Sequence, residues 1–268
     1  MNISFLTTIF PRHKDDYRGT FIGTLVEVLS QKNKKLKIRV IVPSSKHSLL
    51  YEKWGSIKIH RFKYWINQNQ QCIAYGDYTL ANLKKSIFAL IQFPFYVIIF
   101  FLKTLKFWNV TSIFHCQWTV TAIFPIVINK LLFFKPNKPI IITCRGSDLR
   151  SLPGWLNRYL LKNSIAVTYP SPLFTMSRYN QFIKEDIIKL INKSTPLGVF
   201  TIFDPLNEEK ITYDIDIEKN KLGIKNNKII LWLARFTSLK NPLFALQIIR
   251  ELKKSMSDFC LLMVGDGP

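Results

Sequence analysis

Short apolar runs alternate along this chain with longer segments in which apolar residues recur at helical spacing. The pattern predicts a strand at 3–7, an amphipathic helix at 21–29 and a second strand at 36–42. Parallel strands need such crossover helices between them. Four further strands are predicted at 57–61, 112–116, 140–144 and 165–169. The class predicted is therefore α/β with a doubly wound sheet.

The composition changes after Asp204 and Pro205, where acidic residues become frequent. A second unit of strand, helix and strand is predicted after this change. Such a change is typical of a domain boundary. The new unit has predicted strands at 229–233 and 259–264, with Asn241 and Pro242 as the expected N-cap and first residue of its helix.

These boundaries predict an N-terminal domain over residues 1–200 and the start of a second domain over 206–268. A doubly wound sheet usually has about five or six strands. Two predicted strands are too few for one, so we expect the second domain to be incomplete in this chain.

One long apolar segment, 86–102, has no charged residue. Lysines flank it on both sides: Lys84, Lys85, Lys103 and Lys106. Its length is near the lower limit for crossing a bilayer, but Pro94 interrupts it and the sheet needs the strands on either side of it together. Two interpretations stay open, a buried core helix and a helix lying in the membrane interface.

The charge balance points to an anionic partner, because 38 Lys and Arg against 17 Asp and Glu give a net charge of +21. Hydrophobic residues at 48% and aromatic residues at 14% exclude a disordered chain. Nucleic acid, an anionic membrane surface and a phosphorylated substrate all fit the charge, as does a lysine-rich solvated surface. No nucleic-acid-binding motif accompanies the basic residues, so we expect no specific nucleic acid partner.

The cysteines and histidines are scattered. Cys72, Cys116, Cys144 and Cys260 form no CxxC pair, which predicts neither a zinc site nor a disulfide framework. The N-terminal apolar run is short and has no basic leader, so we expect a cytoplasmic protein with reduced thiols.

Candidate ligand-binding residues follow the predicted strands, because open α/β sheets bind ligands beyond the carboxyl ends of their strands. Gly19 ends a basic loop at a helix start, where an anion is favoured, although it could equally serve only the turn. Arg145 and Asp148 follow the strand at 140–144 and suit a polar or phosphorylated ligand; Asp148 could instead cap a helix. His115 ends another strand and is a weaker candidate, because a lone histidine is usually structural.

In the second unit, Arg235 and Lys240 flank a short loop before a helix start. Two cations there would neutralise a diphosphate. Gly265 begins the corresponding glycine-containing loop after the next strand. Neither loop is a Walker or Gly-x-Gly-x-x-Gly fingerprint, so the residues alone predict an anion site and nothing finer.

Taken in order, these segments resemble retaining nucleotide-sugar glycosyltransferases of the family 4 type. The resemblance is carried by Phe-Pro-Arg at 10–12, Ile-Phe-His-Cys-Gln-Trp at 113–118, Thr-Cys-Arg-Gly-Ser-Asp at 143–148, Pro-Leu-Gly-Val at 196–199, Phe-Asp-Pro at 203–205, Leu-Ala-Arg-Phe at 233–236, Lys-Asn-Pro at 240–242 and Val-Gly-Asp-Gly-Pro at 264–268. It implies the GT-B architecture of two Rossmann-like domains, the second incomplete here.

The resemblance also implies an activity: transfer of a sugar from a nucleoside diphosphate sugar to an acceptor, with retention at the anomeric carbon and without a metal ion or other cofactor. Arg235 and Lys240 would be the catalytic residues that hold the diphosphate, with Gly19 and Gly265 approaching the donor. Arg145, Asp148 and His115 would contact the acceptor. We expect a glycan or lipid-linked acceptor and a peripheral position on the inner face of the membrane.

Three positions depart from the family pattern. Arg145 stands where the family often has histidine, Ala234 replaces a glycine, and Phe200 replaces an aspartate. The family's paired glutamates would lie beyond Pro268. A catalytically inactive, membrane-associated binding module is therefore the alternative function.

Overall fold

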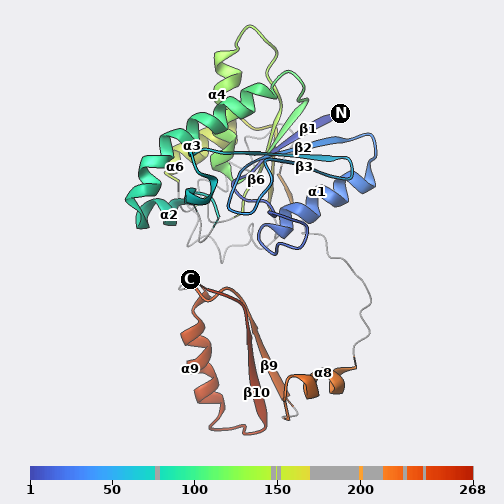
Figure 1. Cartoon of the computed structure of the whole chain (residues 1–268), viewed down its shortest axis with the longest axis vertical. Helices are drawn as coiled ribbons and strands as arrows, with labels where there is room; N and C mark the ends of the chain where they lie inside the picture. Colours follow the sequence, from blue (N-terminus) through green and yellow to red (C-terminus); the bar gives the residue numbers. More distant parts are fainter. Residues whose placement is uncertain are drawn as a thin grey trace. The chain divides into compact units, whose positions relative to one another are not determined.

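The structure is a computed structural model that describes residues 1–75, 79–145, 149, 152–169, 199–201, 214–225, 228–237 and 240–267. It divides into two compact units, Met1–Leu206 and Asn207–Pro268 (Figure 1). Each unit is described by itself. The predicted site residue Asp148 and the motifs at 196–198 and 203–205 lie outside the described residues.

The first unit is built on one eight-stranded sheet, ordered β3-β4-β2-β1-β5-β6-β7-β8. Its strands are β1 (Asn2–Leu6), β2 (Lys37–Pro43), β3 (Tyr51–Trp54), β4 (Ile57–Phe62), β5 (Ile113–Gln117), β6 (Ile140–Thr143), β7 (Ala166–Tyr169) and β8 (Val199–Thr201). All neighbours pair in parallel except β3, which runs antiparallel to β4 at the edge.

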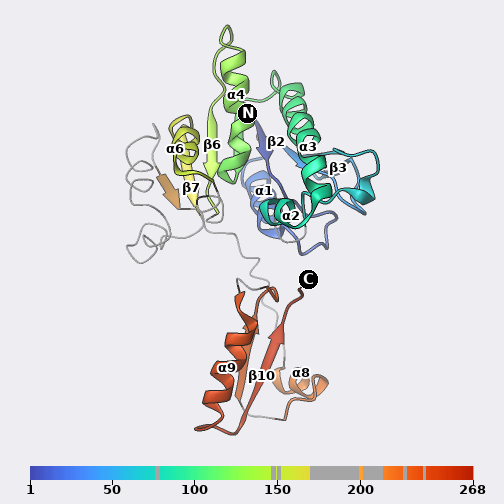
Figure 2. The same ribbon diagram turned by 90° about the vertical axis from the view of Figure 1, so that its left-hand side faces the viewer.

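Helices cover both faces of this sheet. The helices are α1 (Thr20–Lys32), α2 (Thr79–Lys85), α3 (Ile87–Lys106), α4 (Ile123–Leu131) and α6 (Gly154–Lys162), with short 3-10 helices η1 (Gln68–Gln70) and η2 (Thr119–Ala122). The strand order moves one way through α1 and the other way through α3, α4 and α6. Because crossovers are right-handed, α1 lies on one face and the other three lie on the opposite face (Figures 1 and 2).

Two hydrophobic cores match these two faces. Phe5, Ile22 and Val40 belong to the core under α1. Phe62, Phe100 and other residues of β4, β5, α3 and α4 form the larger core on the opposite face. The side chains of β1 divide between them, since successive residues of a strand point to opposite faces.

The predicted fold class is confirmed. Each of the eight strands predicted from the sequence overlaps an observed strand, and 259–264 coincides with β10 (Phe259–Val264). The short strands β3 and β8 were not predicted. In β3 the two central residues, Glu52 and Lys53, are charged, which hides the strand from any search for apolar runs.

The second unit contains α8 (Ile215–Lys221), β9 (Lys228–Leu233), α9 (Pro242–Leu252) and β10. Strands β9 and β10 pair in parallel over six residues, from Lys228 with Phe259 to Leu233 with Val264. The predicted start of α9 is confirmed: Pro242 is its first residue, and the Asn241 side chain accepts a hydrogen bond from the Phe244 N–H.

Candidate functional site

Three neighbouring strands of the first unit, β1, β5 and β6, end at the same edge of the sheet. Their parallel registers place Leu6 beside Cys116, and Gln117 beside Thr143. The segments that follow these strands therefore meet at the carboxyl edge, where an open α/β sheet binds its ligand. Gly19, His115 and Arg145 all belong to these strands or to the segments after them.

Gly19 is the N-cap of α1 and has φ +76°, in the left-handed region that favours glycine. A Cβ at this position would lie 3.1 Å from the Phe10 Cα, so the start of the helix is in close contact with the backbone of Phe10. The turn needs glycine for both reasons. The backbone N–H groups that begin α1 lie at this edge, as the predicted anion site requires.

The loop between β1 and α1 is held by a buried carboxylate. Asp16, only 2% exposed, accepts hydrogen bonds from the Arg12 side chain at 2.6 and 2.9 Å. It also accepts from the backbone N–H groups of Arg12 and Arg18. Burial raises the pKa of this carboxyl, but these hydrogen bonds outweigh it and lower the pKa to about 2. The loop is thereby fixed around a permanent negative charge.

A second cation anchors the other side of the loop. Arg61, buried in β4, donates to the Pro11 carbonyl at 2.6 Å and to the Leu49 carbonyl at 3.1 Å. It also pairs with Glu52 of β3. The loop after β1 is thus tied to two strands on one side of the sheet, so its arrangement is set by the fold before any ligand binds.

Phe21 and Gln117 contact the Arg145 guanidinium, and Trp118 contacts Phe21; we call these four residues the Arg145 cluster. The guanidinium lies 4.6 Å from the centre of the Phe21 ring. Its Nε and Nη2 donate to Gln117 Oε1 at 3.3 and 3.2 Å. The indole of Trp118 meets the Phe21 ring edge-on at 6.1 Å.

Gln117 and Trp118 are site residues that the sequence reasoning did not select. Trp118 has φ +68°, an uncommon backbone conformation for a tryptophan, which is held by its N–H bond to the Thr143 carbonyl. The available signal was a polar residue directly followed by an aromatic one at the end of an apolar strand.

His115 lies under this cluster. It is 7% exposed, and its ring lies 4.5 Å from the ring of Phe5. Its Nε2 shares a 2.8 Å hydrogen bond with Thr143 and lies 3.3 Å from the Gln117 amide nitrogen. Burial, followed by the charge of Arg145, lowers the pKa of His115 to about 3. The structure therefore places His115 as a neutral support for Gln117, and its contact with an acceptor stays a prediction.

In the second unit, Arg235 and Lys240 lie on the loop between β9 and α9, and both are exposed. The last residues of this loop are held close to its middle, because the Lys240 and Asn241 N–H groups donate to the Thr237 carbonyl at 3.0 and 3.1 Å. The cations thus stand at the carboxyl end of β9 and the N-terminus of α9. This arrangement suits a phosphate group.

Gly265 follows β10 at the same edge of the small sheet. A Cβ at Gly265 would lie 1.8 Å from the Ala234 carbonyl oxygen, which no side chain could tolerate without moving the backbone. The two loops are joined further by the bond from the Phe236 N–H to the Asp266 carbonyl at 2.7 Å. Gly265 therefore allows the loops after β9 and β10 to touch, beside the two cations.

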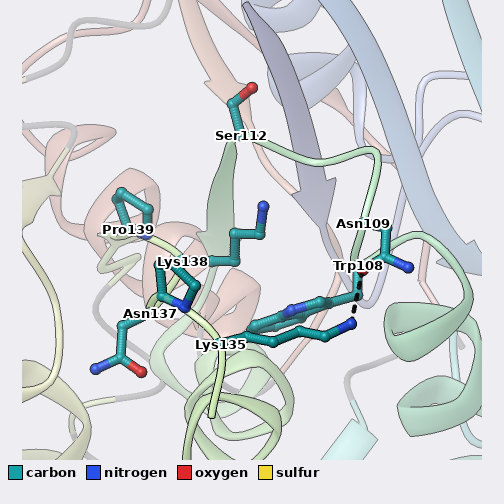
Figure 3. Close-up of a pocket in the computed structure, with 8 residues that line it drawn as sticks. Trp108, Asn109, Ser112, Lys135, Asn137, Lys138 and Pro139 are labelled. Atoms are coloured by element: carbon teal, nitrogen blue, oxygen red, sulfur yellow. Dashed lines mark hydrogen bonds between the residues drawn. The ribbon is translucent and has the colours of Figure 1, made fainter. Parts of the chain in front are cut away.

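A hollow of about 300 Å³ lies at the opposite edge of the first unit, before β5 and β6 (Figure 3). Trp108, Asn109, Ser112, Lys135, Pro136, Asn137, Lys138 and Pro139 line it. Two of these residues are hydrogen-bonded, since Lys135 donates to the Asn109 amide oxygen at 3.4 Å. The hollow has no carboxyl or imidazole group in its lining, and it lies away from the carboxyl ends of the strands, so we do not assign it to the predicted chemistry.

Metal ligands do not gather in the part of the chain that the structure describes: no group of three or more His, Cys, Asp or Glu side chains there could hold a metal ion. No protein-family model matches the sequence, and no curated protein resembles it closely enough in sequence to count as a relative.

Solved structures do resemble this chain in fold. Sucrose-phosphate synthase from Thermosynechococcus elongatus matches 99% of the chain with a TM-score of 0.62 and 13% identity. The catalytic domain of starch synthase IV from Arabidopsis thaliana, bound to ADP and acarbose, matches 100% with a TM-score of 0.61 and 13% identity. A trehalose-6-phosphate structure from E. coli, bound with UDP-2-fluoro glucose, matches 100% with a TM-score of 0.60 and 10% identity.

The chain spans 62%, 68% and 65% of the lengths of these three structures, respectively. At such low identity the likeness concerns the fold alone, and the more specific placement in family 4 stays a prediction. The strand order and these structural neighbours together show that the chain has the GT-B fold of nucleotide-sugar glycosyltransferases.

Proposed function

We propose that this chain is a glycosyltransferase that moves a sugar from a nucleoside diphosphate sugar to a glycan or lipid-linked acceptor, with retention at the anomeric carbon. The observation that carries the proposal is the position of Arg235 and Lys240 at the carboxyl end of β9, beside the loop contact made possible by Gly265. The GT-B fold supports it, since similar structures were solved with ADP, UDP-2-fluoro glucose and UDP.

The chemical work of the two cations follows from the leaving group. When the bond between the sugar and the diphosphate breaks, negative charge grows on the phosphate oxygens. Arg235 and Lys240 stabilise that charge, and backbone N–H groups at the start of α9 add to their effect. The departing phosphate takes the proton of the attacking hydroxyl, so the reaction needs no separate side chain as base.

The Arg145 cluster is the proposed acceptor site of the first unit. Trp118 and Phe21 supply flat apolar surfaces of the kind against which a sugar ring packs, and the Arg145 guanidinium supplies a donor for hydroxyl or phosphate oxygens. An acceptor carrying a phosphate, such as a lipid-linked glycan, fits this combination. Such an acceptor places the protein on the inner face of the membrane.

The first test is nucleotide binding by the chain itself, measured by calorimetry with UDP and with ADP. We expect one of the two to bind, and Arg235→Gln combined with Lys240→Gln to weaken it by at least about tenfold, since hydrogen bonds to charged groups contribute about 1.5–3 kcal/mol each. The matched control is Arg250→Gln combined with Lys253→Gln. It removes the same number of exposed charges at the other end of α9 and leaves the affinity unchanged.

The second test is release of the nucleoside diphosphate from UDP-glucose or ADP-glucose, with a polyprenyl-phosphate-linked sugar as acceptor. In the first test, the donor site would be contradicted if neither nucleotide bound, or if the control variant weakened nucleotide binding as much as Arg235→Gln combined with Lys240→Gln. Nucleotide binding without release of the diphosphate from either donor would favour a catalytically inactive binding module instead.

A further inference from the structure

Helix α3 buries two uncharged polar residues on the face that packs on the sheet, and it exposes most of its large apolar residues on the other face. Its buried residues are Ala89, Gln92, Tyr96, Phe100 and Thr104, which form one stripe at helical spacing. Gln92 donates to the Gln70 carbonyl at 2.8 Å and accepts from the Cys72 N–H at 3.2 Å. Thr104 donates to the Phe100 carbonyl at 2.9 Å. Gln92 and Thr104 thus have hydrogen-bond partners inside the protein.

The opposite stripe of α3 is apolar and exposed. It contains Ile87, Phe88, Leu90, Ile91, Phe93, Phe95, Ile98, Leu102 and Leu105. The most apolar 18-residue window of the helix has a mean hydropathy of 1.9, and 28% of this window is buried. A surface helix of a soluble protein normally has the reverse arrangement. A contiguous exposed apolar stripe of this length marks an interaction surface.

The charge around this stripe has a single sign. Lys84 and Lys85 precede α3, while Lys103 and Lys106 lie in its last turn. The sequence from 78 to 147 contains eight Lys and Arg but no Asp or Glu. Two copies of this surface facing each other would bring like charges together, which opposes self-association. A surface of negative charge and apolar interior complements it.

We propose that the outward stripe of α3 docks the first unit onto an anionic lipid bilayer, with the helix lying in the interface parallel to the membrane plane. The apolar side chains enter the boundary between headgroups and acyl chains, and the lysines meet the lipid phosphates. Trp65 adds an aromatic cluster at one end, with its ring 5.4 Å from Phe88 and 5.5 Å from Phe95. Aromatic side chains favour this depth.

Two features distinguish docking from crossing. The strands on either side of α3, β4 and β5, belong to one sheet, and the buried stripe of the helix packs against it. Pro94, on the exposed side, has no N–H to donate to the Leu90 carbonyl. That carbonyl keeps a partner in the hydrated interface but would lack one in the hydrocarbon centre.

A second contact point lies beside the first. Helix α4 packs next to α3, with Phe100 and Phe124 stacked at 4.4 Å between ring centres (Figure 2). The segment after α4 exposes Phe133 and Phe134, with Lys135 next in the chain. It gives the docked unit a second apolar anchor at the edge of the sheet where α3 ends.

Docking adds to the proposed function the kind of surface on which transfer takes place. The biological role of docking rests on the proposed function, but vesicle binding itself can be measured without a donor or an acceptor. A chain that binds vesicles but no nucleotide would refute the donor site alone, and a chain that binds UDP but no vesicles would refute docking alone.

The experiment is co-sedimentation of the full chain with vesicles of phosphatidylcholine, with and without phosphatidylglycerol. We expect binding to the anionic vesicles that weakens as salt is added. Ile98→Gln combined with Leu102→Gln should lower the partition coefficient at least about tenfold, given roughly 0.8 kcal/mol per buried methylene. Lys84→Gln combined with Lys106→Gln should lower it by a similar factor on anionic vesicles only.

The matched control is Leu49→Gln combined with Leu50→Gln. These leucines are 64% and 47% exposed, against 55% and 53% for Ile98 and Leu102, but they lie outside α3, in the segment before the edge strand β3. Circular dichroism verifies that each variant folds. The proposal would be overturned if the control lost as much vesicle binding as Ile98→Gln with Leu102→Gln, or if the parent chain did not bind vesicles. A lipid-free dimer that Ile98→Gln with Leu102→Gln dissociates would also overturn it.

Discussion

The guanidinium of Arg145 lies 4.6 Å from the ring centre of Phe21, although 124 positions separate the two residues in the chain. The contact joins the start of α1 to the segment after β6, and Gln117 of β5 accepts hydrogen bonds from the same guanidinium. It is the physical link between three segments that lie far apart in sequence.

This contact predicts a measurable coupling between the two side chains. In a double-mutant cycle with Phe21→Leu and Arg145→Gln, we expect a coupling of about 0.5–2 kcal/mol in the free energy of unfolding, as cation–π pairs give. Urea unfolding of the four proteins measures it. A cycle of Phe21→Leu with Lys130→Gln should give no coupling, because Lys130 lies over Tyr159 instead. Coupling in both cycles would show a general effect of Phe21.

Gly19→Ala should destabilise the first unit by about 1–3 kcal/mol, because alanine meets an unfavourable φ and the Phe10 backbone at once. Gly55→Ala separates these causes. Gly55 has φ +58° but open space around its Cβ position, so only the conformational cost applies. Thermal unfolding of both variants gives the comparison, and an equal loss of stability would mean that contact with Phe10 contributes nothing.

Asp16→Asn should cost about 1–3 kcal/mol in the free energy of unfolding, since a neutral amide cannot replace the carboxylate that accepts from Arg12 and Arg18. Asp15→Asn, one residue earlier and exposed, should change stability little. The low pKa of Asp16 fixes the pH at which its contribution disappears. The stabilisation is complete above about pH 4 and is lost as the pH falls toward 2.

His115 predicts a different dependence on pH. Its pKa falls from 6.5 to about 3 on folding, so between these values the unfolded chain binds the additional proton. The contribution of His115 to the free energy of unfolding should therefore be highest above pH 6.5 and decrease on acidification, by up to about 1.4 kcal/mol per pH unit. His115→Gln should reduce this slope in urea unfolding between pH 6.5 and 4. An unchanged slope would mean that the imidazole takes up its proton without unfolding.

The sequence predicted the main sheet well, because a buried parallel strand is a run of apolar residues whatever surrounds it. It could not predict which face of α3 is buried. Gln92 and Thr104 would be assigned to solvent by any rule that counts polar residues outward, yet both are buried. Their burial depends on their hydrogen-bond partners. The partners of Gln92 are the backbone groups of Gln70 and Cys72, which lie in a loop whose position cannot be predicted from the spacing of apolar residues.

The candidate site divides in the same way. Gly19, Arg235, Lys240 and Gly265 were found from local signals, namely a strand end, a helix start and a glycine between them. The assembly of the Arg145 cluster depends on the order of β1, β5 and β6 in the sheet. The same order buries His115. Long-range pairing determines both, and a single sequence contains no direct signal for it.

The pairing of β1 with β5 also has a consequence for synthesis. Ile3 pairs with Ile113, so the first strand to leave the ribosome waits for a neighbour made 110 residues later. At about 5–20 residues per second this wait lasts roughly 5–20 seconds. Helix α3 is made before Ile113, so its apolar residues leave the ribosome while one edge of β1 is still open. A nascent chain in that state is a natural client for chaperones, and slowing translation before residue 113 should lower its soluble yield.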